Sequence, residues 1–173
     1  VLICGYGRLG QNLLRMLTDQ GIAAMALDLD PQRIRQAAAA GEPVIYGNAT
    51  QPGVLRAAGI EKASVLVVAL DNPNAAVKLV KYARSIRSDI HIVARARDRT
   101  DVYRLYQAGA DDIVRELFDS SLRAGRYVLE NMGLSEFEAA EAERLAQARA
   151  AMSGQELQAV IANARQLKLQ QET

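Results

Sequence analysis

The 173-residue sequence predicts a doubly wound α/β fold, in which a parallel sheet of about six strands carries helices on both faces. Short β-branched runs alternate with amphipathic helical stretches from residue 1 to residue 114. Glycines follow these helical stretches where a left-handed stop is expected, at Gly21, Gly41, Gly59 and Gly109. The run at residues 65–70 is apolar throughout, which is typical of a central parallel strand. Together these observations favour right-handed β-α-β crossovers.

The individual elements follow from apolar periodicity. Strands are predicted at residues 1–4, 22–28, 44–46, 65–70, 90–94 and 112–114. Helices are predicted at residues 8–19, 31–40, 74–87 and 100–108, with a brief helix that ends near Gly59. Pro31 suits the first turn of its helix, because the N–H that proline lacks has no helical partner there.

The C-terminal part of the chain has a different pattern. No strand pattern follows Phe118, and residues 120–132, 135–151 and 155–171 are predicted as helices rich in Ala, Glu and Gln. We therefore divide the chain into a sheet domain, residues 1–118, and a helical part, residues 119–173. The helical part is either a partner-binding pair of helices or a loosely held extension. We favour partner contact for its first part, because a lone tail would bury little surface.

Composition excludes several classes of protein. The formal net charge is +1, so we expect no nucleic acid partner. No apolar run reaches the roughly 20 residues of a membrane span. The single cysteine, Cys4, lies in a predicted apolar strand, where we expect a buried side chain that packs in the core. One cysteine cannot form a disulfide within the chain, which suits a reducing compartment. The first strand begins at Val1, from which we expect further residues upstream in a longer protein.

The stretch "VLICGYGRLGQ" contains Gly5, Gly7 and Gly10 between a predicted strand and a predicted helix. In a nucleotide-binding turn, the first glycine allows the tight turn and the second lets the backbone approach a phosphate. The third lets helix and strand pack closely. The N–H groups of Arg8, Leu9 and Gly10 would then point at the anion from the helix N-terminus.

An acidic residue follows at the spacing that such a site requires. The second strand ends in "LDLD", and Asp28 lies where a carboxylate accepts hydrogen bonds from both ribose hydroxyls. A carboxylate repels a 2′-phosphate, so the sequence favours NAD(H) or AMP over NADP(H). Leu29 and Asp30 adjoin the site, and Asp30 either assists in binding or caps the helix at Pro31.

Three further segments end at the same edge of the predicted sheet. Asn48, Ala49 and Thr50 follow the third strand and flank the expected adenine pocket, where a plain turn is the alternative. The fourth strand ends in Ala69, Leu70 and Asp71, which we expect to line the crevice. In "ARARD", alternation places Arg95 and Arg97 on the same side, so we predict a phosphate or carboxylate contact rather than solvated arginines.

Residues for catalysis are not evident. The only histidine, His91, lies within a predicted strand and is expected to be structural. No tyrosine is followed by lysine four residues later, and no Cys/His cluster forms a metal-ligand pattern. The chain leaves no room for a substrate domain after Val114. A nucleotide-binding module with a helical tail therefore indicates sensing rather than turnover.

With these residues in view, the chain resembles the RCK or KTN family, the cytosolic nucleotide-binding domains that regulate potassium channels and transporters. Within that family it is most similar to the C-terminal domain of Kef-type systems, the glutathione-gated potassium/proton antiporters of Gram-negative bacteria. The matching segments are "GYGRLGQ", "LDLDPQRI", "YGNATQPGVLRAAGI", "IVARARD", "RLYQAGAD" and "VRELFDSSLRAGRYVLENMGL".

The resemblance implies a Rossmann-like domain that binds AMP or NAD(H) and controls a membrane transport domain at the cytoplasmic face of the bacterial inner membrane. It implies a homodimer built across residues 119–132. It also implies glutathione or its adducts as effectors at the dimer interface, contacted by Arg15 and Arg115.

The chain departs from the family's pattern at three positions. Ala40 stands where a gating phenylalanine is expected, Ala150 falls near an expected glutathione-binding asparagine, and Asn48 replaces the aspartate of a "GDAT" motif. Two other hypotheses stay open: a fragment of an NAD-dependent oxidoreductase, and a stand-alone nucleotide-binding subunit of a potassium transporter.

Overall fold

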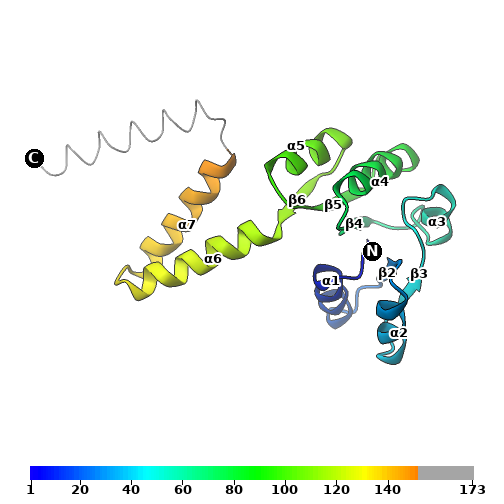
Figure 1. The fold of residues 1–173 in the computed structure, drawn as a ribbon, viewed down its shortest axis with the longest axis horizontal. Coiled ribbons are helices and arrows are strands. Elements are labelled where there is room, and N and C mark those ends of the chain that lie inside the picture. The colour runs from blue at the N-terminus through cyan, green and yellow to red at the C-terminus, as the bar shows by residue number, and fades with distance from the viewer. Residues whose placement is uncertain (152–173) are drawn as a thin grey trace, which may run out of the picture. The chain divides into compact units, whose positions relative to one another are not determined.

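The computed structural model describes residues 1–151, and the chain divides into two units between Glu116 and Leu117. The first unit contains a sheet and five helices, and the second is helical (Figure 1). Within the described residues, none of the helices has the length and apolar character needed to cross a membrane.

The first unit is built on one six-stranded sheet with the order β3-β2-β1-β4-β5-β6, and every neighbouring pair is parallel. The strands are β1 (Leu2–Cys4), β2 (Met25–Asp28), β3 (Val44–Tyr46), β4 (Val65–Val68), β5 (His91–Ala96) and β6 (Asp112–Arg115). The order reverses between β1 and β4. The predicted Rossmann-like, doubly wound fold is thereby confirmed.

Helices cover both faces of this sheet (Figure 1). On one face, α1 (Arg8–Asp19) and α2 (Pro31–Ala39) contribute Leu14 and Ala37 to a core with Ile3. On the other face, the helices are α3 (Pro52–Ala57), α4 (Pro73–Ile86) and α5 (Arg99–Ala108), packed on a larger core that contains Leu2 and Cys4. Adjacent residues of β1 thus enter opposite cores, because side chains alternate along a strand.

Several predicted boundaries were wrong by a few residues. The second strand begins at Met25 rather than residue 22, because the N–H of Ile22 donates to Leu17 O (2.9 Å) and completes the helix stop at Gly21, where φ is +69°. The fourth strand ends at Val68, two residues early. The fifth strand extends to Ala96, because its pairing with β6 continues to Arg115.

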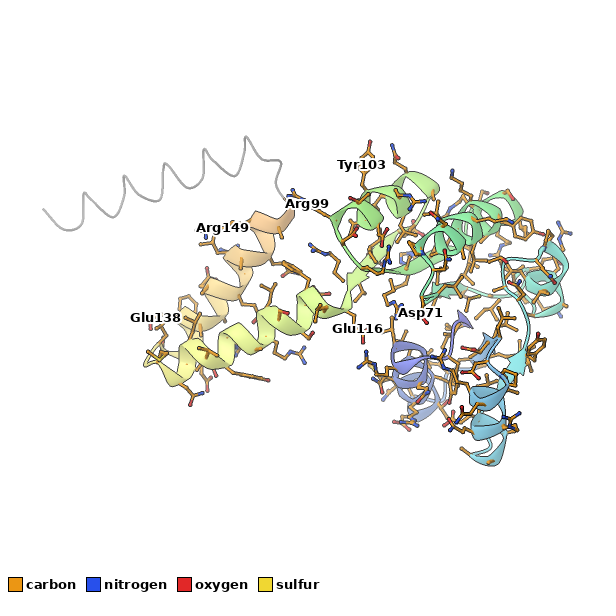
Figure 2. All side chains as sticks on the ribbon, viewed as in Figure 1. Asp71, Arg99, Tyr103, Glu116, Glu138 and Arg149 are labelled. Atoms are coloured by element: carbon orange, nitrogen blue, oxygen red, sulfur yellow. The ribbon has the colours of Figure 1, made fainter. Side chains whose placement is uncertain are left out.

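The described part of the second unit contains α7 (Glu136–Ala151) and all of α6 (Glu116–Asn131) except its first residue. Helix α6 begins four residues before the predicted start. A capping box starts α7 near Glu138, which is labelled in Figure 2. The N–H and hydroxyl of Ser135 each donate to Glu138 Oε2 at 2.8 Å. These hydrogen bonds lower the pKa of Glu138. Arg126 pairs with Glu130 of its own helix (2.9 Å) and Glu143 of α7 (3.8 Å). The helix predicted at residues 155–171 lies outside the described residues.

Candidate functional site

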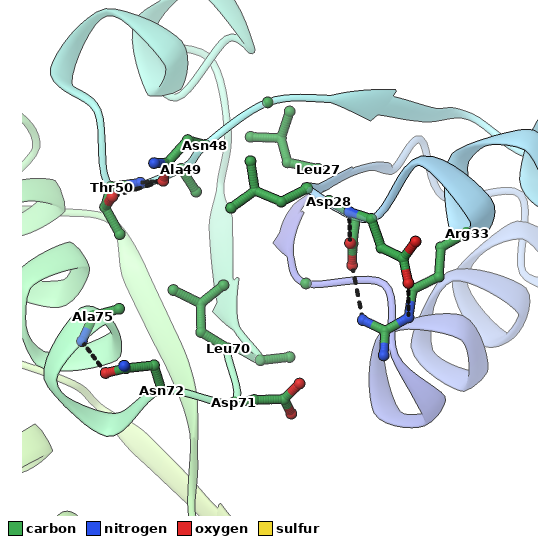
Figure 3. A pocket seen from close by; sticks show the side chains of 15 residues that line it. Leu27, Asp28, Arg33, Asn48, Ala49, Thr50, Leu70, Asp71, Asn72 and Ala75 are labelled. Carbon is green, nitrogen blue, oxygen red and sulfur yellow. Dashed lines mark hydrogen bonds and ion pairs between the residues drawn. The ribbon is translucent and has the colours of Figure 1, made fainter.

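A cavity of about 540 Å³ opens at the carboxyl ends of the strands, around the point where the strand order reverses (Figure 3). Crevices at this position are the usual ligand sites of open α/β sheets. The cavity is lined by Gly5, Leu27, Asp28, Leu29, Asp30, Arg33, Gly47, Asn48, Ala49, Thr50, Ala69, Leu70, Asp71, Asn72 and Ala75.

The glycine turn between β1 and α1 has no room for side chains at two positions. A Cβ on Gly5, where φ is +108°, would collide with the carbonyl oxygen of Ala69, and a Cβ on Gly10 would collide with that of Gly5. Gly7 is different, since the nearest atoms to its missing Cβ are the terminal nitrogens of Arg33, each at 3.9 Å. The turn is therefore closely packed at Gly5 and Gly10 and open at Gly7.

The N-terminus of α1 begins at this turn with its donors uncapped. Its N-cap is Gly7, no side chain caps the helix, and its first turn contains no acidic residue. A helix N-terminus carries free N–H groups and a partial positive charge, so it attracts anions. The cavity lining does not include the residues of this turn, namely Gly7, Arg8, Leu9 and Gly10.

Asp28 ends β2 and connects the glycine turn to the following loop. It is only 8% exposed. Its Oδ2 accepts from the N–H of Tyr6 at 2.7 Å, and its Oδ1 accepts from the N–H of Asp30 at 2.7 Å. The guanidinium of Arg33 reaches Oδ2 at 3.3 Å (Figure 3). The carboxylate is thus fixed beside the turn that precedes α1.

Arg33 is a charged residue of the cavity wall that the sequence analysis did not assign to the site. It lies in the first turn of α2, where the side chain of Asp30 caps the helix by accepting from the N–H of Gln32 at 2.9 Å. The Nε of Arg33 lies 3.7 Å from Asp30 Oδ2. The signal was present in "LDLDPQR", as a basic residue five positions after Asp28. Asp30 therefore fills the capping role that was one of its two alternatives.

The loop after β3 forms another wall of the cavity. The side-chain carbonyl of Asn48 accepts from the N–H (3.0 Å) and hydroxyl (2.6 Å) of Thr50, which is the geometry of an Asx turn. Ala49 is buried. A Cβ on the preceding Gly47 would lie 2.9 Å from Val54, so the loop is packed tightly onto α3. The side chain of Asn48 is thus held at the cavity wall through its carbonyl oxygen.

The loop after β4 completes the cavity. The N–H of Ala69 donates to Cys4 O at 2.8 Å, which holds this loop against the glycine turn. Asn72 caps α4 by accepting from the N–H of Ala75 at 3.0 Å (Figure 3). Asp71 (labelled in Figure 2) is exposed at the rim. It pairs with Arg95 at 2.6 Å.

Arg95 and Arg97 do not line the cavity. Arg95 lies within β5, is mostly buried, and contacts both Asp71 and, at 3.7 Å, Glu116. Arg97 follows the strand and pairs with the buried Asp101 at 3.1 Å. Arg95 thus adjoins the rim through Asp71, whereas Arg97 is engaged by α5.

The two arginines assigned to an effector lie on separate elements. Arg15 is an exposed residue of α1 whose Nε lies 4.0 Å from Glu42. Arg115 is the last residue of β6 and is half-buried. Their proposed roles stay predictions.

Neither Cys4 nor His91 lines the cavity. Cys4 is fully buried, as predicted, and burial raises its pKa to about 12, so its thiol is inert near neutral pH. His91 begins β5 at the opposite edge of the sheet, where its Nε2 lies 2.6 Å from Asp112. Across residues 1–151, no cluster of three or more His, Cys, Asp or Glu side chains is arranged to hold a metal.

Residues 1–116 match the TrkA-N domain family. The chain belongs to that family. Its TrkA-N domain coincides with the unit that contains the sheet and the cavity.

Relatives of this TrkA-N chain include Kef proteins, as the sequence resemblance indicated. The glutathione-regulated potassium-efflux system protein KefC of Cronobacter sakazakii is 40% identical over 141 residues, which cover 82% of this chain and 23% of KefC. The solved Kef CTD of Shewanella denitrificans, in its AMP-bound form, is 36% identical with a TM-score of 0.76. That match covers 84% of this chain and 89% of the Shewanella chain.

A second solved relative is the TrkA-N domain of the inner membrane protein ybaL from Escherichia coli. It is 28% identical, with a TM-score of 0.66, over 75% of this chain and 93% of that chain. The present chain spans less than a quarter of the length of the KefC proteins that it matches.

Proposed function

We propose that this chain is a regulatory domain that binds an adenine nucleotide, AMP or NAD(H), in the cavity at the carboxyl edge of its sheet. The observation that carries the proposal is the juxtaposition of the uncapped N-terminus of α1 with the buried carboxylate of Asp28. The N–H groups of the first would donate hydrogen bonds to the phosphate, and the carboxylate of the second would accept hydrogen bonds from the ribose hydroxyls. The AMP-bound state of the Shewanella Kef CTD supports the same ligand class.

The regulated partner in this proposal is a membrane transport domain of a potassium/proton efflux antiporter, on the same or an associated chain. Relatedness to KefC supports this assignment. The domain would act at the cytoplasmic face of a bacterial inner membrane. Ligand binding would bias the transport domain through a difference in affinity between two states, which any allosteric switch requires.

We prefer regulation to catalysis because of the chemistry of the cavity wall. Its ionisable side chains are three carboxylates, from Asp28, Asp30 and Asp71, and the guanidinium of Arg33. Asp28 and Asp30 are engaged in backbone hydrogen bonds, and Asp71 in an ion pair. A dehydrogenase would need a positioned proton donor next to the nicotinamide, and this wall supplies none that is poised for that role.

A homodimer and a second ligand complete the proposal. Dimerisation would use α6, none of whose residues is buried in the described part of the chain. Glutathione or an adduct would act as effector through Arg15 and Arg115. The related KefC proteins are glutathione-regulated, which supports this class of effector. Titration of glutathione into the parent chain and into Arg115→Gln tests this part, and no heat from the parent would remove it.

The nucleotide proposal is tested by asking what the purified chain retains and what it binds. Mass spectrometry of the denatured protein should recover AMP or NAD(H). Calorimetry should then show binding of that nucleotide, with a loss of about 2 kcal/mol or more of binding free energy in Asp28→Asn, because charge-assisted hydrogen bonds to the ribose are weakened. Asp19→Asn, an exposed residue at the end of α1, is the matched control.

Two results would contradict the proposal. Unchanged nucleotide affinity in Asp28→Asn would show that the ribose binds elsewhere. Steady oxidation of NADH with a small carbonyl compound would favour the alternative of an oxidoreductase fragment.

A further inference from the structure

Arg33 lies between Asp28, the proposed ribose site, and Gly7 at the N-terminus of α1, the proposed phosphate site. It extends from the first turn of α2 toward Asp28, with Asp30 beside it (Figure 3). Its side chain is 37% exposed, so the guanidinium is accessible to a ligand in the cavity. Among residues 1–151, Nη1 and Nε have carboxylate partners, and Nη2 has no hydrogen-bond or ion-pair partner.

The same guanidinium lies next to the glycine turn. Both of its terminal nitrogens are 3.9 Å from the position that a Cβ on Gly7 would occupy. Gly7 is the N-cap of α1, where the backbone N–H groups are free to bind an anion. An anion at this helix end would therefore come within reach of Arg33 from the side.

The hydrogen bonds of Asp28 leave too few acceptor positions for both Arg33 and a ribose. A carboxylate offers about four lone-pair positions, and three donors already use them: two backbone N–H groups, of Tyr6 and Asp30, and Arg33. A ribose brings two hydroxyl donors, one more than the remaining position accepts. The backbone bonds are 2.7 Å long and fixed by the chain, whereas the Arg33 contact is longer, at 3.3 Å, and belongs to a flexible side chain.

From these contacts, and on the basis of the proposed nucleotide-binding function, we infer that Arg33 exchanges partners when the ligand binds. Its guanidinium leaves Asp28 to the ribose and pairs with the 5′-phosphate at the N-terminus of α1. Arginine suits this role, because its planar fork matches phosphate oxygens as well as carboxylates. Arg33 is thus the residue that makes the cavity prefer a 5′-phosphorylated nucleoside to the bare nucleoside.

The test compares adenosine, 5′-AMP and 2′-AMP as calorimetric ligands of the whole chain. The variants are Arg33→Gln, Arg33→Lys and a matched control, Arg35→Gln, which removes an exposed charge from the same helix without touching the cavity. Arg33→Gln should reduce the preference for 5′-AMP over adenosine about tenfold, the expected effect of one charge-assisted hydrogen bond. Arg33→Lys should reduce it less, and Arg35→Gln should leave it unchanged.

The opposing outcomes are separate. Equal losses for adenosine and 5′-AMP would mean that Arg33 only holds the cavity wall in place. A larger loss for 2′-AMP than for 5′-AMP would place the guanidinium at the ribose instead of at the glycine turn. If the parent binds 5′-AMP and Arg33→Gln keeps its preference, the partner exchange is wrong and the proposed function stands. If the parent binds no adenine nucleotide, the proposed function itself fails.

Discussion

At the scale of single residues, Gly10 decides how closely α1 packs on the end of β1. A side chain there would meet the carbonyl oxygen of Gly5, which is backbone and cannot turn away. Gly53 in α3 is a useful contrast, because a Cβ added there meets no atom within 4 Å. The two positions therefore separate the steric requirement of the turn from the general effect of replacing a glycine.

We predict that Gly10→Ala lowers the free energy of unfolding by about 2 kcal/mol or more, the usual scale of overpacking in a rigid site. Gly53→Ala should be neutral or stabilise the chain by up to about 1 kcal/mol, because alanine favours a helix. Urea denaturation measures both. Equal stabilities of the two variants would show that the turn can make room for a Cβ at position 10, contrary to the structure.

The residues of the turn could be predicted from the sequence because their constraints are local. Gly5 is required by a tight turn and Gly10 by a close contact between helix and strand, whereas Asp28 ends a strand. Each of these requirements fixes a residue type at a characteristic spacing in the sequence. Arg33 could not be assigned in the same way. Its partners, Asp28 and the neighbourhood of Gly7, are brought together by the packing of β1 against β2, which no local pattern encodes.

At the scale of elements, Asp111 connects the start of β5 to the end of α4. It accepts from the N–H of Ile92 at 2.7 Å and from Arg84 Nη2 at 2.8 Å. The hydrogen bond from Ile92 and the charge of Arg84 lower the pKa of the Asp111 carboxyl. Since the pKa in the folded chain is below the unfolded value near 3.9, the carboxylate stabilises the fold above that pH.

We predict that Asp111→Ala costs about 1 kcal/mol of stability at pH 7, a modest value because the side chain is partly exposed. This difference from the parent should shrink as pH falls through the lowered pKa of Asp111, where the parent carboxyl also becomes neutral. Thermal unfolding between pH 7 and pH 3 measures it. Asp19→Ala is the control, and a difference that persists undiminished at pH 3 would mean that the charge of Asp111 is not what stabilises the fold.

The elements themselves were more predictable than their ends. The alternation of apolar strands and amphipathic helices gave each element of the sheet unit, because burial on a sheet or helix imposes a period on the sequence. The predicted start of the second strand at Ile22 was wrong, because this β-branched residue completes the stop of α1 instead of starting a strand. The length of β5 depended on its partner β6, so Ala96 could not be assigned from its own segment.

At the scale of the whole molecule, α6 presents large apolar side chains without cover from the described residues. Leu117 and Val128 of α6 are 78% and 61% exposed, and the helical period places them on the same side of the helix. Met132, which follows the last residue of α6, is 76% exposed. Exposed apolar stripes of this kind mark protein interfaces. This is the surface that the proposed homodimer would use.

We predict that Val128→Asp weakens self-association at least tenfold, because the dimer would bury an unpaired carboxylate. Arg123→Asp introduces an aspartate five positions before Val128, and the helical period places it on another side of α6. This variant should weaken self-association less. Sedimentation equilibrium measures both dissociation constants. A parent chain that is monomeric at every concentration would contradict the dimer and leave the nucleotide site untouched.

The structure of the whole chain crystallised with excess AMP tests the central claim most directly. We expect the phosphate on the free N–H groups of α1, the ribose on Asp28, and the guanidinium of Arg33 turned from that carboxylate to the phosphate. AMP bound at any other surface, or a cavity that stays empty at saturating AMP, would contradict the account.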